Sequence, residues 1–152
     1  TGLVNKIEPT DDELAQVLAH EIAHALAKHT AEKMSVALAT SLGVLAVSVA
    51  TDNRNIATGA SAAALVAVTL PNSRVAESEA DEIGVELAAR AGFNPHAAVT
   101  LWQKMSKESG SSSFDFLSTH PSSDKRIDRL QALVPRMMPY YEEQKPHPVY
   151  PL

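Results

Sequence analysis

The feature that most constrains this chain is an apolar segment with polar residues inside it. Residues 17–29 read VLAHEIAHALAKH, and this run of Val, Leu, Ile and Ala predicts a buried helix that contains His20, Glu21 and His24. Burying imidazole and carboxylate groups costs free energy unless each group has a polar partner or a metal ion. The fold must therefore supply such partners to this helix.

His20 and His24 are four residues apart, which places both side chains on one face of a helix. Two imidazoles at this spacing can bind one zinc ion. Glu21, rotated about 100° from His20, can act as a general base toward the attacking water, and HExxH is typical of zinc metallopeptidases. The alternative is a pair of core histidines with separate hydrogen-bond partners, which the apolar surroundings disfavour.

A catalytic zinc site usually has three protein ligands and one open position, so a third ligand is required. The extended pattern HExxHxxGxxH does not supply it, because Ala27 and Thr30 occupy the positions of its Gly and third His. His29 comes one position early and points nearly opposite His20 on a continuous helix. It is predicted to be a surface residue near the end of that helix.

A second helix is predicted to open at Pro71 and close at Gly92, and its segment 74–92 carries the acids that could complete the site. Glu77 and Asp81 flank its apolar stripe on the same side as Gly84 and Ala88, and these small residues would let two helices approach closely. Glu77 is best placed to enter a buried site, and Asp81 can accept the second ring N–H of a zinc-binding histidine. The alternative is an ordinary charged helix. The predicted stripe comprises Ala76, Ala80, Ile83, Leu87 and Ala91, and the acids predicted to face solvent are Glu79, Glu82 and Glu86.

Three motifs together resemble the gluzincin endopeptidases of the HtpX, BepA and CAAX-prenyl-protease group, peptidase family M48. They are HEIAH at 20–24, SRVAESEADEIGVELAARAGFNP at 73–95 and STHPSSDKRI at 118–127. The resemblance spans residues 14–130. It implies that Glu77, the first Glu of an E-x-x-A-D motif, is the third zinc ligand and that Asp81 is the Asp of that motif.

The expected fold is mainly α, a gluzincin-type helical metallopeptidase core over residues 1–134 followed by a proline-rich tail over 135–152. The chain begins TGLVNKIEPT, without an initiator Met, and we expect a fragment or processed form. The resemblance implies that the edge strand of the cleft, which would pair with extended substrate, lies upstream of this start.

Helix-capping and helix-breaking residues predict where the helices begin and end. Thr10 and Glu13 form a capping box, so a helix starts near residue 11 and is expected to run to about residue 32. Gly92 ends the second acidic helix, and Asn94-Pro95 begins a helix that reaches about Glu108. A further helix follows Pro121, and irregular structure is predicted from Pro135 onward.

Two apolar runs, 34–50 and 56–70, are shorter than the roughly 20 residues of a bilayer-spanning helix. The favoured interpretation is a buried or surface-packed helical hairpin over 34–70. A hairpin that contacts a membrane or a membrane protein is the alternative, because small residues permit close helix packing. The resemblance implies a bacterial envelope location, periplasmic and membrane-associated. No oligomeric state is predicted.

His120 lies in STHPSS, which is similar to the T-H-P motif of the family. It could donate a hydrogen bond to the developing oxyanion, occupy the open zinc position at rest, or only cap the following helix. Arg126 and Arg74 could support acids beside the site, although surface ion pairs are the favoured interpretation for both. His96 and His147 are predicted to be exposed.

These features predict a zinc endopeptidase with one Zn²⁺ per chain, held by His20, His24 and Glu77, with Glu21 as the base. The resemblance implies extended or misfolded envelope polypeptides as substrates. A net charge of -5 disfavours nucleic acid as a partner, and the absence of cysteine excludes disulfides and thiolate catalysis. The alternatives are a latent or chaperone-like zinc module without peptidase activity and a structural helical domain without metal.

Overall fold

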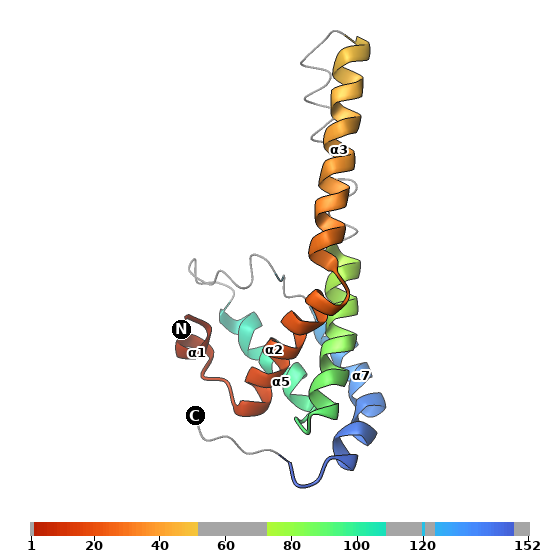
Figure 1. The fold of residues 1–152 in the computed structure, drawn as a ribbon. Helices are drawn as coiled ribbons and strands as arrows, with labels where there is room; N and C mark the ends of the chain where they lie inside the picture. Colours follow the sequence, from red (N-terminus) through yellow and green to blue (C-terminus); the bar gives the residue numbers. More distant parts are fainter. Residues whose placement is uncertain (1, 52–72, 109–119, 121–123, 148–152) are drawn as a thin grey trace. The chain divides into compact units, whose positions relative to one another are not determined.

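The computed structural model describes residues 2–51, 73–108, 120 and 124–147. Over this part of the chain the protein is mainly helical and contains no strand, so the expected mainly α fold is confirmed. The helices are α1 (Gly2–Ile7), α2 (Asp11–Leu26), α3 (His29–Thr51), a helix over residues 73–90, α5 (His96–Glu108) and α7 (Asp124–Glu143) (Figure 1).

The chain divides into two compact units. The first comprises residues 1–23 and 78–152, and the second comprises residues 24–77. α2 continues without a break across the boundary after Ala23, and helix 73–90 does the same after Glu77. The local geometry of each of these two helices is therefore that of one continuous helix.

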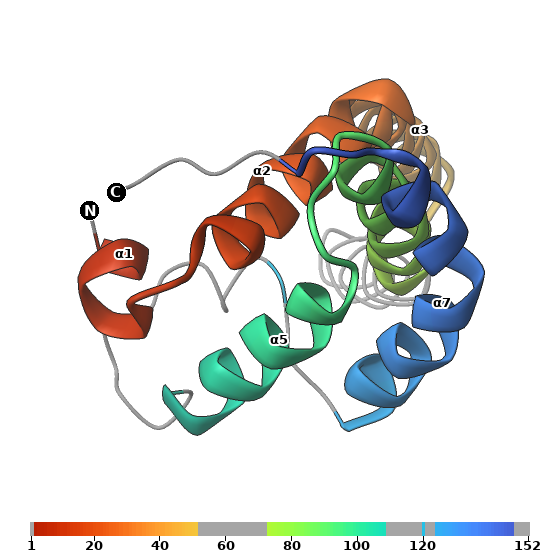
Figure 2. The ribbon, with the colours of Figure 1, turned by 90° about the horizontal axis from the view of Figure 1, so that it is seen from below.

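The apolar core of the first unit is built by helix 73–90, α5 and α7, with Ile7 added from α1. α5 packs against both α7 and α1 (Figure 2). Trp102 and Met105 of α5 are almost completely buried. The other core residues are Val85, Ala89, Ala98, Val99, Leu101, Leu130, Val134 and Met137.

The start of α2 is held by the predicted capping box. Glu13 Oε2 accepts from the backbone N–H of Thr10 at 2.9 Å, and Thr10 Oγ1 accepts from the N–H of Glu13 at 3.3 Å. Glu13 is itself buried, and its carboxylate also pairs with Lys104 at 2.6 Å and accepts from Thr100 at 2.7 Å. Burial raises the pKa of Glu13, but the contacts with Lys104, Thr10 and Thr100 outweigh it, so the pKa is lowered overall.

The end of α2 differs from the sequence prediction. The helix stops at Leu26, and α3 begins at His29, whereas a single helix was expected to reach about residue 32. The break occurs at Lys28, whose φ of 59° lies in the left-handed region that ends a helix. His29 therefore does not follow the phase of α2. It is 2 % exposed, so its predicted surface position is wrong.

α3 is an apolar helix with an exposed surface. By length and composition, His29–Ala50 is long and apolar enough to cross a membrane, with a mean hydropathy of 1.7, and none of that window is buried. α3 begins at His29, five residues before the predicted run, and the packed hairpin over 34–70 stays a prediction. The most exposed large side chains are Met34, Leu38, Leu42, Leu45 and Val49. The second predicted run, 56–70, lies outside the described residues.

α7 also departs from prediction, because it continues through Pro135 and Pro139 to Glu143. The irregular structure expected from residue 135 is wrong for this part of the chain. Both prolines are exposed, while Val134 and Met137 on the same helix are buried in the core. Core packing of the apolar face therefore offsets the hydrogen bonds that two prolines remove from the helix.

Helix 73–90 ends where the sequence predicts. Gly92 has a φ of 87°, a conformation that glycine adopts without steric cost. The N–H of Phe93 donates to the carbonyl of Ala88 at 2.9 Å, and the N–H of Gly92 donates to Ala89 at 3.0 Å. These two bonds form a Schellman motif. α5 then begins at His96, after Asn94-Pro95, as predicted.

Candidate metal centre

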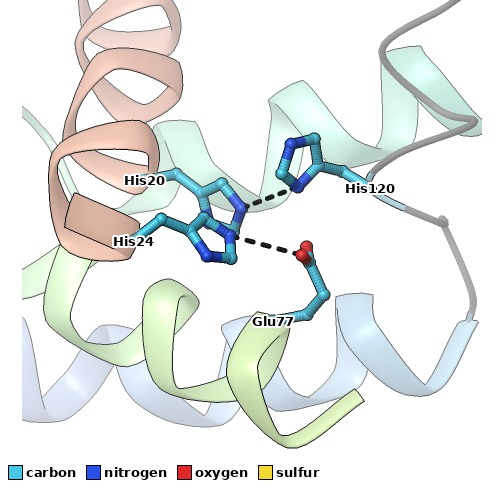
Figure 3. Close-up of side chains that lie close together, drawn as sticks. All are labelled: His20, His24, Glu77 and His120. Carbon is cyan, nitrogen blue, oxygen red and sulfur yellow. Dashed lines mark hydrogen bonds and ion pairs between the residues drawn. The ribbon is translucent and has the colours of Figure 1, made fainter. Parts of the chain in front are cut away.

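Four side chains gather their potential ligand atoms within 4.8 Å of one another: His20, His24, Glu77 and His120 (Figure 3). His20 and His24 come from successive turns of α2, and Glu77 comes from helix 73–90. His20, His24 and Glu77 are buried, whereas His120 is partly exposed. All four are among the site residues considered from the sequence.

Two of the distances within this group are those of neighbouring ligand atoms around a zinc ion. His20 Nε2 lies 3.3 Å from His120 Nδ1, and His24 Nε2 lies 3.3 Å from Glu77 Oε1. In a tetrahedral zinc site with bonds of about 2.0–2.1 Å, neighbouring ligand atoms are about 3.3 Å apart. The donor set of imidazole nitrogens and one carboxylate oxygen is also one that zinc accepts. The residues present therefore fit such an ion.

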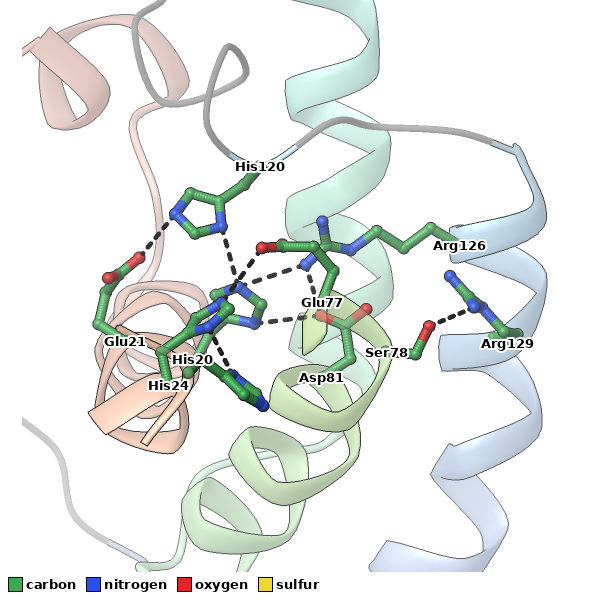
Figure 4. Close-up of polar contacts among 10 residues, drawn as sticks. His20, Glu21, His24, Glu77, Ser78, Asp81, His120, Arg126 and Arg129 are labelled. Atoms are coloured by element: carbon green, nitrogen blue, oxygen red, sulfur yellow. Dashed lines mark hydrogen bonds and ion pairs between the residues drawn. The ribbon is translucent and has the colours of Figure 1, made fainter. Parts of the chain in front are cut away.

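The second ring nitrogen of His20 faces a buried ion pair. His20 Nδ1 lies 3.2 Å from Asp81 Oδ1, and the same oxygen accepts from Arg126 Nη2 at 2.6 Å (Figure 4). The guanidinium of Arg126 also stacks 3.6 Å over the ring of Trp102. Arg126 is only 2 % exposed, so the favoured interpretation of it as a surface ion pair is wrong.

Arg126 could not be recognised as buried from its local sequence, because the pattern DKRIDR around it is typical of an exposed helical turn. Its burial requires both a carboxylate and an aromatic face from other elements. Asp81 on helix 73–90 and Trp102 on α5 supply them. Arg74, the other arginine considered, is exposed.

Gly84 determines how closely α2 and helix 73–90 approach beside His20. A Cβ atom on Gly84 would lie 3.0 Å from both the Cα and the N of His20, and 3.2 Å from the carbonyl carbon of Ala19. Backbone atoms cannot move aside as a flexible side chain can. The predicted role of Gly84 in close helix packing is therefore confirmed.

Helix 73–90 buries a face slightly rotated from the predicted stripe. Ala76 and Ala80 are buried as expected, but Ile83 and Leu87 are only half-buried and Ala91 is exposed. The polar pair Glu77 and Asp81 lies on the buried face with Gly84, Val85 and Ala88. The rotation follows from the polar site, since burying Glu77 and Asp81 displaces the apolar residues of the same helix toward its sides. Glu79 and Glu82 are exposed, and Glu86 is half-buried.

Glu21 stands at the exposed edge of this group. Its side chain is half exposed, and its Oε1 lies 3.3 Å from His120 Nε2. The His120 ring thus contacts His20 through Nδ1 and Glu21 through Nε2 (Figure 4). The predicted base and the predicted zinc-binding histidine are therefore bridged by one imidazole from a distant part of the chain.

One residue beside His24 was not predicted to belong to the site. His29 Nδ1 lies 2.8 Å from His24 Nδ1, and the two rings meet edge to face with centroids 4.9 Å apart. The spacing of His29 from His24 would predict a contact between them only if the helix ended before His29. Lys28, where it ends, is not a residue type that predicts a helix end. His96 is exposed as predicted, while His147 is half-buried and stacks on Tyr141.

Comparison with known proteins gives a family match over most of the chain. The model of peptidase family M48 matches residues 1–134. Mitochondrial metalloendopeptidase OMA1 of Saccharomyces cerevisiae is 37% identical over 144 residues, which cover 88% of this chain and 39% of that protein. OMA1 of Schizosaccharomyces pombe is 41% identical, over 82% of this chain and 37% of its own length.

A bacterial relative matches at a lower identity. The beta-barrel assembly-enhancing protease of Escherichia coli is 30% identical over 77% of this chain and 26% of its own length. The chain thus spans less than two fifths of each of these curated relatives. No solved structure matches it significantly.

Proposed function

Because the chain belongs to peptidase family M48, we propose that it is the catalytic part of a metalloendopeptidase that uses one zinc ion per chain. In this proposal His20, His24 and Glu77 hold the metal. The observation that carries it is that their ligand atoms and that of His120 all lie within 4.8 Å of one another. The 3.3 Å between His24 Nε2 and Glu77 Oε1 suits a tetrahedral zinc site with bonds of about 2.0–2.1 Å.

The chemistry would be peptide hydrolysis. When bound, zinc supplies a Lewis acid that polarises the peptide carbonyl and lowers the pKa of water. Glu21 would accept the proton of the attacking water at its carboxylate and deliver it to the leaving amine. Its position supports this role, because the carboxylate is half exposed and reaches His120 beside the metal group without being part of that group.

His120 supports a second candidate, a latent form of the same enzyme. Its Nδ1 lies 3.3 Å from His20 Nε2, within the group that could bind one ion. A fourth protein ligand would fill the position that water needs, and cleavage would then wait for His120 to leave. The remaining role considered for it, donation to the oxyanion, would need the ring to stay near the site but off the metal.

The substrates we propose are extended or misfolded polypeptides at a membrane. α3 supports membrane contact, because it is long and apolar enough to span a bilayer and leaves its large apolar side chains exposed. Mitochondrial proteins and a beta-barrel assembly-enhancing protease are both among the relatives. We further propose a membrane-associated location in the bacterial envelope and envelope proteins as the substrates.

Metal analysis and a cleavage assay test the proposed function together. Purified protein should contain zinc in a one-to-one ratio and cleave an unfolded polypeptide, and Glu77→Ala should lose both properties. Glu79→Ala is the matched control, since Glu79 lies two residues away and is exposed. Zinc without cleavage would support a latent or binding module, and full activity without metal would contradict the proposal.

A further inference from the structure

We propose that His29 is a positioning residue for His24: its Nδ1 accepts the hydrogen bond from His24 Nδ1–H and so directs His24 Nε2 toward the metal. This inference rests on the proposed function, in which His24 is a zinc ligand. It assigns a role to a residue that the HExxH pattern does not include and that the sequence analysis placed at the surface.

The contact is short and buried. His29 Nδ1 lies 2.8 Å from His24 Nδ1, and His29 is 2 % exposed. The opposite nitrogen of the same His24 ring, Nε2, lies 3.3 Å from Glu77 Oε1. His24 is thus held from two sides, with the proposed metal on one side and another imidazole on the other.

The positions of the ring protons determine which histidine is the hydrogen-bond donor. A neutral imidazole has one N–H and one lone pair, and a metal takes the lone pair. If His24 binds metal through Nε2, its proton must be on Nδ1, so His24 is the donor. His29 Nδ1 must then be the acceptor, and the proton of His29 is on its own Nε2. A partner of this kind fixes the tautomer and orientation of a metal-binding histidine.

The backbone explains how His29 reaches this position. A helix continued from α2 would turn residue 29 away from residue 24, because five residues correspond to about 500° of rotation. The positive φ of Lys28 ends α2 and starts α3 at His29, which places the ring against His24. The unusual conformation of Lys28 thus coincides with the contact that supports the metal site.

The two histidines on α2 would then have different partners. His20 Nδ1 faces the carboxylate of Asp81, whose charge is paired with Arg126. His24 Nδ1 faces an uncharged imidazole in this assignment. His29 can therefore orient His24 without adding a further carboxylate to a site that already contains Glu77 and Asp81.

The test compares two substitutions of His29 in the whole chain. His29→Phe keeps a ring but removes the acceptor, whereas His29→Asn places an amide oxygen near the position of Nδ1. Zinc affinity, measured by competition with a chelator, should fall about 10–100-fold in His29→Phe and be largely restored in His29→Asn. His96→Phe is the matched control, because His96 is also the first residue of a helix but is exposed.

Two further measurements separate positioning from folding. Thermal unfolding of the metal-free variants shows whether either substitution damages the fold. Nitrogen-15 NMR of the zinc-loaded wild-type protein locates the ring protons directly and should find them on His24 Nδ1 and His29 Nε2. This measurement needs no variant, so it tests the inference even if His29→Phe does not fold.

Several results would overturn the inference. Unchanged zinc affinity in His29→Phe, equal weakening in His29→Phe and His29→Asn, or a proton on His29 Nδ1 would each do so while leaving the zinc site intact. A wild-type protein that binds no zinc would overturn the proposed function as well. The two failures are therefore distinguishable.

Discussion

Arg126 Nη2 lies 2.6 Å from Asp81 Oδ1, and both side chains are buried. That carboxylate oxygen also faces His20 Nδ1 at 3.2 Å. Asp81 therefore has two partners. It would orient His20, a proposed zinc ligand, and Arg126 compensates its buried charge. Removing Asp81 would affect both metal binding and folding, and the two effects can be separated.

Asp81→Ala should weaken zinc binding by about 10–100-fold through the loss of support for His20. It should also lower the free energy of unfolding by about 3–5 kcal/mol, because the buried Arg126 loses the carboxylate that compensates its charge. Glu79→Ala should change neither quantity. Chelator competition and urea denaturation measure the two effects, and equal behaviour of Asp81→Ala and Glu79→Ala would contradict the assignment.

The double variant Asp81→Ala/Arg126→Met separates the two roles of Asp81. Met can fill part of the space beside Trp102 without a charge, so much of the lost stability should return. Zinc affinity should stay low, because His20 Nδ1 still lacks its carboxylate partner. Recovery of both quantities would mean that Asp81 acts on the metal site only through folding.

Gly84→Ala should destabilise the protein by about 1–3 kcal/mol, since its Cβ would press against the backbone of His20. Gly43→Ala is the matched control, because no atom of the described residues lies within 4 Å of the corresponding position in α3. There the better helix propensity of Ala should raise stability by up to about 1 kcal/mol. Denaturant unfolding of both variants gives the comparison. Unchanged or raised stability in Gly84→Ala would mean that α2 and helix 73–90 are not in close contact at Gly84.

Glu21→Gln should abolish peptide cleavage and retain zinc, because Glu21 is proposed as a base and lies outside the ligand group. Loss of a general base typically lowers the rate by about 10²–10⁴. Metal content and single-turnover cleavage are measured on the same sample. Loss of zinc in this variant would show that Glu21 is a ligand instead.

His120→Ala should raise basal cleavage if the imidazole occupies the water position at rest, as its 3.3 Å distance from His20 Nε2 favours. An oxyanion role would give the opposite result, a kcat lowered by about 10²–10³ with zinc retained. The assay requires matched zinc loading of both proteins. Unchanged kinetics would exclude both roles and leave a helix-capping histidine.

Glu13 should make the metal-free protein less stable in acid. Its pKa is lowered in the folded state from an ordinary value of 4.5, so its stabilisation is present above that value and is lost as the pH falls through the folded pKa. Glu13→Gln should lower the free energy of unfolding by about 1–3 kcal/mol at neutral pH and flatten its acid dependence. Urea denaturation between neutral pH and pH 3 measures this, with exposed Glu79→Gln as control. An unchanged acid slope would contradict it.

The sequence alone determined which polar residues share a helix face and where several helices begin or end. The spacing of His20 and His24 placed both on one face of α2, and the same argument placed Glu77 and Asp81 together on helix 73–90. The capping box at Thr10 and the helix end at Gly92 were also predicted correctly. These features depend on residues within four or five positions of one another, so the sequence specifies them without knowledge of the fold.

Tertiary structure decided the surroundings of those residues. Arg126 is buried only because Asp81 and Trp102 come from other helices, and α7 continues past Pro135 because its apolar face packs in the core. His29 reaches His24 only because Lys28 adopts a left-handed conformation that its residue type does not predict. In the first two cases the stabilising contacts come from residues distant in sequence, and in the third the backbone adopts a conformation that costs free energy. A local pattern contains neither.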